Sequence, residues 1–341
     1  MHKTLLISVI VLFASIPSTA QQNNIWYFGL RGGLNFNVVP GSSPPVAIGN
    51  SAMTANEGCA SICDNYGQLL FYSNGITVYN RNHQVMQNGD NLAGNLSSVQ
   101  SCLIVPKPGN DLIYYIFTSD ALENNFTNGY CYSVVDLNLD NGNGAVTTKN
   151  SLLMAPCTER MTAVRHANGT AVWVITNDNN SNIFRAWLID CNGLQSVPVV
   201  SNTGMVLGQD ITENMGMMKI SPDGKQLCQT HFADIAGVPT DVQLFDFDNA
   251  TGILSNPRTI GFPNTQIKSC EFSPDSKFLY LVRTADMAID QVEATLPSAT
   301  AIIASRVTIN TGSSRFIGIQ LAIHIHKTVI QKLLHPFALF G

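Results

Sequence analysis

One polar segment has a residue spacing that could support chemistry, because it resembles the opening of a calcium-binding loop. Asp136, Asn138 and Asp140 alternate with leucines, as the first ligands of such a loop alternate with other residues. The sixth position is Asn141 where the loop needs glycine, and the twelfth is Thr147 where it needs glutamate. Asp and Asn side chains also bond backbone amides two residues on, so we expect a turn and no calcium site. The same reasoning applies to Asp190, Asp246 and Asp248.

The histidines do not form a recognisable site in the sequence. His324 and His326 would share one face of a strand, as a metal pair does, but no acid or cysteine is near and Lys327 follows. The others considered are scattered along the chain: His83, His166 and His231. No Ser-His-Asp order, nucleophile elbow, phosphate-binding loop or dinucleotide-binding glycine motif occurs. We therefore assign no catalytic, metal-binding or cofactor-binding residue, no cofactor and no identified binding residue, although distant segments could still assemble a site.

Eight cysteines are spread over the chain. They are Cys59, Cys63, Cys102, Cys131, Cys157, Cys191, Cys228 and Cys270. The first two are separated by three residues, not by the two of a zinc knuckle, and no second pair is near. We expect most to be buried as small apolar residues. An even number permits one or two disulfides in an exported chain, but the sequence does not choose among 105 pairings.

The composition indicates a turn-rich β protein. Among 341 residues, 45% are hydrophobic and only 12% are charged, with a net charge of -5. The chain contains 33 Asn and 26 Gly, both suited to the left-handed backbone of tight turns. This composition argues against disorder, against a helical protein and against a nucleic-acid-binding surface.

The N-terminus resembles an export signal. A short basic start, Met1 to Lys3, precedes an apolar stretch from Leu5 to Ile16 and small residues up to Ala20. Ser15, Pro17 and Ser18 interrupt the stretch too early for a membrane anchor. We expect a signal peptide at 1–20, a secreted or cell-surface protein beginning at Gln21, and no membrane span after cleavage.

A repeated segment defines the elements that must position any site. Ser-Pro-Asp-x-Lys occurs at Ser221 and at Ser273, 52 residues apart, each time between two runs of alternating apolar residues. This pattern is typical of a β-hairpin. Weaker copies have turn centres at Tyr66, Gly109 and Asn168, which are spaced by 43, 59 and 55 residues up to Asp223. Such spacing is typical of propeller blades.

A second hairpin recurs inside the same unit, at 133–144, 186–193 and 242–252. Each unit therefore holds about four strands, which predicts an all-β fold: a β-propeller of four-stranded antiparallel blades. We expect six to seven blades over residues 21–322, with the last one incomplete. A tandem array of immunoglobulin-like domains is the alternative, but each such domain needs about 100 residues.

Two further features have both a structural and a functional interpretation. The aromatic segment 24–29 (NIWYFG) could stack on a ligand, but we expect an opening strand that pairs with the last blade and closes the ring. Glycosylation sequons at Asn95, Asn125, Asn168 and Asn249 are expected by chance in an Asn-rich chain and indicate exposed turns.

Several segments together resemble the N-terminal propeller of large secreted Bacteroidetes proteins. They are 24–29, 56–62 (NEGCASI), 69–86 (LLFYSNGITVYNRNHQVM), 104–109 (IVPKPG), 114–117, 163–169 and 244–248. Those proteins typically carry PKD-like repeats and a gliding-motility-associated or type IX secretion sorting domain after the propeller. The resemblance covers about residues 24–322. It implies a WD40/YVTN-like propeller, a cell-surface location and adhesion or binding, and it supplies no catalytic residues.

The C-terminal segment departs from this pattern. After Gly318 to Ala322 the family would continue with another Pro-Asp-Gly-Lys turn and a further blade, whereas residues 323–341 contain no turn signal. We expect 323–341 to be an atypical tail of a truncated or frame-shifted copy. A short helix from Lys327 to Leu334 is the alternative.

Three functional interpretations remain open. The first is a secreted, non-enzymatic binding or adhesion module for a protein or glycan ligand, linked to surface attachment or gliding motility. The second is an extracellular propeller enzyme, hydrolase- or lactonase-like, with a site in the central channel. The third is a non-functional truncated product. Acids and histidines gathered around one ion would favour the enzyme, and an apolar or aromatic rim would favour binding.

Overall fold

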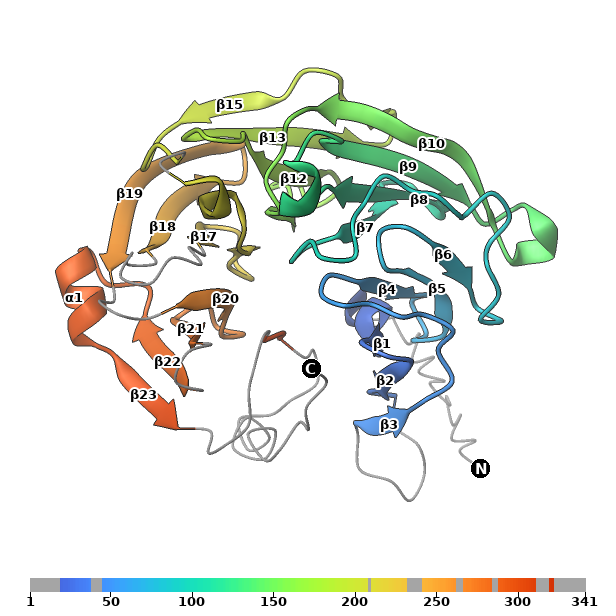
Figure 1. Ribbon diagram of the computed structural model, residues 1–341, viewed down its shortest axis with the longest axis horizontal. Helices are drawn as coiled ribbons and strands as arrows, with labels where there is room; N and C mark the ends of the chain where they lie inside the picture. Colours follow the sequence, from blue (N-terminus) through green and yellow to red (C-terminus); the bar gives the residue numbers. More distant parts are fainter. Residues whose placement is uncertain are drawn as a thin grey trace, which may run out of the picture.

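The structure, a computed structural model, describes residues 19–37, 45–207, 210–231, 241–261, 266–283, 288–310 and 319–321. In these residues six antiparallel sheets follow one another in chain order around a common centre (Figure 1). This arrangement is the predicted β-propeller, and each sheet is a blade. Only one α-helix is found in the described part of the chain, so the all-β prediction is confirmed.

The strands of the blades follow in chain order. Blade one contains β1 (Ile25–Phe28), β2 (Gly32–Asn35) and β3 (Val46–Ile48). Blade two contains β4 (Ala60–Cys63), β5 (Leu69–Ser73) and β6 (Val78–Asn80). Blade three contains β7 (Cys102–Lys107), β8 (Asn110–Ser119), β9 (Tyr130–Asp136) and β10 (Ala145–Met154). Blade four contains β11 (Met161–Arg165), β12 (Val172–Asn177), β13 (Ile183–Asp190), β14 (Gly193–Leu194) and β15 (Val199–Asn202). Blade five contains β16 (Met218–Ile220), β17 (Gln226–Thr230), β18 (Asp241–Asp248) and β19 (Ile253–Gly261). Blade six contains β20 (Ile267–Phe272), β21 (Phe278–Arg283), β22 (Ala288–Glu293) and β23 (Val307–Asn310).

Short helical segments complete the described structure. They are η1 (Thr19–Asn23), η2 (Leu122–Asn124), η3 (Asp140–Gly142), η4 (Ile211–Asn214) and α1 (Ala299–Ala304). None of the helices in the described ranges is long and apolar enough to cross a membrane.

The first strand of each blade lies nearest the centre. Each of these strands contacts the first strand of the next blade, in the order β1, β4, β7, β11, β16 and β20. The loops that lead into these strands therefore bring together side chains from blades that are far apart in the sequence.

The repeated Ser-Pro-Asp turns are equivalent hairpins, as predicted. Ser221 Oγ donates to Asp223 Oδ1 at 2.6 Å and accepts from the Gln226 amide at 2.9 Å, between β16 and β17. In the next blade Ser273 repeats both bonds between β20 and β21, at 2.5 and 2.8 Å. The other predicted turn centres also lie between first and second strands: Tyr66, Gly109 and Asn168. The 52-residue register of the sequence is thus the register of the blades.

Each interface between consecutive blades has its own apolar cluster. Buried side chains of blades two and three form one cluster, and those of blades three and four, four and five, and five and six form three more. A smaller cluster around Tyr27 and Tyr72 joins blades one and two. Strand side chains alternate between the two faces of a sheet, so each blade can bury one face against each neighbour.

The expected pairing of the opening strand with the last blade is not found among the described residues. β1 pairs with β2 of its own blade, with Trp26 opposite Leu34 and Phe28 opposite Gly32. Gly29 and Arg31 both have positive φ, 56° and 63°, so the chain reverses directly after Phe28. The structural interpretation of this segment stands, because Tyr27 is 4% exposed and packs on Tyr72.

Several predictions fall outside the described residues. The signal peptide at 1–20 is described only for Thr19 and Ala20, which belong to η1. The tail at 323–341, with His324 and His326, is not described at all.

Candidate functional site

The acidic segments that resembled a calcium loop are turns. Asp136 Oδ1 accepts from the Asn138 backbone amide at 2.8 Å, Asp190 Oδ1 from the Asn192 amide at 2.7 Å, and Asp248 Oδ1 from an amide two residues on. Asp246 instead forms an ion pair with an arginine. No three metal-ligating side chains gather in the part of the chain that the structure describes.

The three described histidines lie in different blades. His83 Nδ1 lies 3.1 Å from the Tyr72 hydroxyl and its Nε2 lies 2.9 Å from the Asn50 amide. His166 accepts from a backbone amide within its own hairpin. Burial, reinforced by the charge of Arg160, lowers the pKa of His231 well below its usual value. These residues form no shared constellation.

Charged side chains meet instead near the centre, in a group that we call the axial cluster: Glu57, Glu159 and Lys268. Glu57 precedes β4 and Lys268 lies in β20, yet Lys268 Nζ contacts Glu57 Oε1 at 2.7 Å. Glu159, which precedes β11, interacts electrostatically with both of them. The cluster therefore joins blades two, four and six.

Glu159 is the most perturbed acid of the axial cluster. It is 1% exposed, and its Oε2 accepts from the Val99 amide at 3.0 Å. Burial raises the pKa of this carboxyl to about 8, mainly by desolvation, and the charge of Glu57 adds to the rise. Lys268 opposes it. Perturbed carboxyls of this kind are common at functional sites, but they also occur in structural networks.

Gln100 and Arg160 tie the loops of neighbouring blades together. Gln100 Oε1 accepts from the amides of Met161 and Met218, at 3.2 and 2.7 Å, and its Nε2 donates to the Met218 carbonyl at 3.1 Å. The fully buried Arg160 guanidinium donates to the Thr230 carbonyl at 2.9 Å and to two carbonyls of 213–215. Both side chains satisfy backbone groups, which is a structural role.

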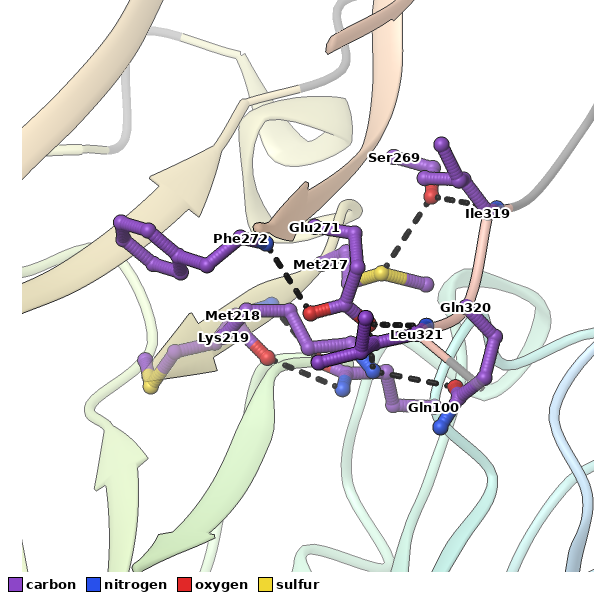
Figure 2. A network of polar contacts seen from close by, with 10 residues as sticks. All are labelled: Gln100, Met217, Met218, Lys219, Ser269, Glu271, Phe272, Ile319, Gln320 and Leu321. Carbon is purple, nitrogen blue, oxygen red and sulfur yellow. Dashed lines mark hydrogen bonds and ion pairs between the residues drawn. The ribbon is translucent and has the colours of Figure 1, made fainter. Parts of the chain in front are cut away.

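A short segment, Ile319–Leu321, lies against β16 and β20 (Figure 2). The Ile319 amide donates to Ser269 Oγ at 3.2 Å, and the Leu321 amide donates to Glu271 Oε2 at 3.1 Å. Lys219 Nζ reaches both Glu271 Oε2 and Gln320 Oε1, each at 3.1 Å (Figure 2). Polar side chains on the first strands thus hold an extended segment by its backbone.

A groove of about 400 Å³ lies between blades two and three. We call it the lateral groove, and its polar and aromatic lining residues include Asn65, Tyr66, Arg81, Asp111 and Asn143. The Tyr66 side chain lies in the first hairpin of blade two and is 72% exposed. Within the described residues no hydrogen bond or ion pair involves the side chains of Arg81 or Asp111, and Asn65 Oδ1 is buried without a hydrogen-bond partner.

Sequence reasoning identified neither site. The residues of the axial cluster lie up to 211 positions apart in the chain, in loops and in β20, so no local motif indicates the cluster. Tyr66 was recognised only as a turn centre, although an exposed aromatic at the tip of a polar hairpin is a signal for binding.

The chain matches no protein-family model and no curated protein. Among solved structures it is similar to a proposed 6-phosphogluconolactonase of Bacteroides fragilis, with 15% identity, a TM-score of 0.49, and coverage of 86% of this chain and 82% of the other. It is similar to Hsv2 of Kluyveromyces lactis at 12% identity and TM-score 0.44, with 81% and 72% covered. Hydrazine synthase of Kuenenia stuttgartiensis follows at 10% identity and TM-score 0.42, with 89% and 90% covered. These values say nothing about the activity or ligand of this chain.

Proposed function

We propose that this propeller is an exported, non-enzymatic binding module that attaches to a protein ligand through the lateral groove. The observation that carries the proposal is that the groove presents exposed side chains that form no ion pair with other described residues. Tyr66 is largely exposed, and Arg81 and Asp111 are exposed without ion pairs among the described residues. Tyr and Arg are enriched among the residues that contribute most to protein–protein binding.

The axial cluster supports this choice by contrast. Its charges compensate one another, and Gln100 is occupied by backbone groups of two blades. Groups that are already paired are poorly placed to bind a ligand, because the ligand would first have to break those contacts. The export-signal pattern at 1–20 and the resemblance to secreted Bacteroidetes propellers support a location at the cell surface.

A peptide selection tests the proposed binding site. A displayed library of random peptides is selected on the folded protein, and the dissociation constants of the enriched peptides are measured by titration calorimetry. We expect Tyr66→Ala and Arg81→Ala each to weaken binding by at least about tenfold. Val197→Ala is the control, because Val197 is 79% exposed and lies in blade four, outside the groove.

Two outcomes would contradict the proposal. One is peptide binding that neither groove variant weakens. The other is the absence of any enriched peptide together with groove-dependent binding to a glycan array, which would make the ligand a glycan. Export is checked separately: N-terminal mass spectrometry of the mature protein is expected to find Gln21 first.

An enzyme remains the second candidate because of Glu159. A carboxyl with a pKa of about 8 holds its proton at neutral pH and could act as a general acid. Its 1% exposure leaves no visible approach for a substrate. Turnover of ester or lactone substrates that is lost in Glu159→Gln, with the fold retained, would favour the enzyme over the binding module.

A further inference from the structure

Two cysteines of neighbouring blades face each other in the core. Cys228 lies in β17 of blade five and Cys270 lies in β20 of blade six, and these two strands are in contact. Both residues are fully buried in the apolar cluster that joins the two blades. The two side chains also interact directly with each other.

The other six cysteines are oriented differently. The thiols of Cys59 and Cys102 donate to backbone carbonyl oxygens, 3.3 Å away in each case, and that of Cys131 donates to one at 3.6 Å. Cys63 and Cys157 are near backbone groups, and Cys191 is exposed. All eight cysteines lie in the described residues. Cys102 interacts electrostatically with Cys59, and Cys157 with Cys131, but among the described clusters only the one between blades five and six holds two cysteines, Cys228 and Cys270.

We propose that Cys228 and Cys270 form a disulfide between blades five and six when the chain folds in an oxidising compartment. The oxidant is a low-molecular-weight disulfide or an oxidised dithiol protein. One cysteine thiolate attacks its sulfur, forming a mixed disulfide and releasing one thiol. The second cysteine then attacks the mixed disulfide and releases the second thiol, so two protein thiols are oxidised and one disulfide is reduced to two thiols.

The timing of this reaction follows from burial. Desolvation raises the pKa of the Cys228 thiol well above its usual value, and only the thiolate is reactive. Exchange must therefore take place before blade six packs on blade five. Once formed, the bond would be closed off from reductants, and it would fix the last described blade to the rest of the ring.

The cross-link is tested on the full chain refolded in a glutathione redox buffer. The protein is unfolded without reductant, free thiols are alkylated, and the digest is analysed by mass spectrometry. We expect a linked peptide containing Cys228 and Cys270, with the other six cysteines alkylated. Alkylation of both Cys228 and Cys270, or linkage of either to another cysteine, would overturn the proposal.

A second measurement separates the cross-link from the packing of the two side chains. Refolding the natural sequence in reductant instead of redox buffer is expected to lower the melting temperature by about 5 °C or more. The double variant Cys228→Ala/Cys270→Ala should melt at the same temperature after either treatment. The control double variant Cys59→Ala/Cys102→Ala should keep the difference. A difference that persists in Cys228→Ala/Cys270→Ala would contradict the proposed pairing.

Discussion

Glu57 and Lys268 are 211 residues apart in the chain, and their side chains form an ion pair of 2.7 Å near the centre of the propeller. One comes from the loop before blade two and the other from the first strand of blade six. Their side chains are 25% and 17% exposed, respectively, and Glu159 lies within electrostatic reach of both. The contact therefore links blade two to blade six.

Removing the cation should destabilise the fold. Lys268→Ala leaves two acids close together without their lysine, and we expect a loss of about 2 kcal/mol in the free energy of unfolding, measured in urea. Lys149→Ala is the control, because Lys149 pairs with Asp90, which is 61% exposed, and this variant should lose much less stability than Lys268→Ala. Equal losses in the two variants would show that the Glu57–Lys268 ion pair stabilises the fold no more than an exposed ion pair does.

The contribution of Glu159 to stability should fall as pH rises from about 4.5 to about 8. Because the pKa of Glu159 is higher in the folded state, this carboxyl holds its proton in the folded protein and loses it in the unfolded chain within this window. The contribution of Glu159 to the free energy of unfolding is complete at low pH and is lost as the carboxyl ionises. The total loss is at most about 5 kcal/mol. Glu159→Gln should flatten this profile in urea titrations at several pH values. Glu123→Gln, at an exposed position, should leave it unchanged.

A methyl group at Gly58 should disturb the loop that carries Glu57. A Cβ there would lie 2.1 Å from the Ser101 amide nitrogen and 2.8 Å from the Ser98 carbonyl oxygen, both of which are backbone atoms. We expect Gly58→Ala to cost about 2–3 kcal/mol in chemical unfolding. At Gly49 nothing lies within 4 Å of the added atom, so Gly49→Ala should be nearly neutral. A neutral Gly58→Ala would mean that the blade-two and blade-three loops separate easily.

The repeated hairpin should be equally sensitive in both blades. Ser221→Ala and Ser273→Ala each remove a buried hydroxyl that accepts a backbone amide and donates to an aspartate. We expect each to cost about 1–2 kcal/mol in thermal or chemical unfolding. The exposed Ser196, replaced by Ala, should change stability by less than about 0.5 kcal/mol. Unequal effects of the first two variants would contradict the equivalence of the two turns.

The fold could be predicted from the sequence because short patterns along the chain specify the strands and turns of each blade. Ser221 and Ser273 mark equivalent hairpins, and short apolar strands on either side alternate between two faces. Within a blade the hydrogen bonds join strands that follow one another in the chain, except in blade four, where β15 pairs with β13. The pattern along the chain therefore predicts the sheet. Turn chemistry likewise accounted for Asp136, Asp190 and Asp248.

What the sequence determined by itself is therefore the blade: its strands, its turns and its repeat. Tertiary structure decided where the ring brings distant residues together. The positive φ at Gly29 and Arg31 turns the chain back after β1, so that β1 pairs with β2 of its own blade. The ion pair of Glu57 with Lys268 and the contact of Cys228 with Cys270 depend on how blades are arranged around the centre and packed face to face. Those contacts have no local signal, because the packing of successive sheets, and not the order of residues within a hairpin, sets which side chains meet.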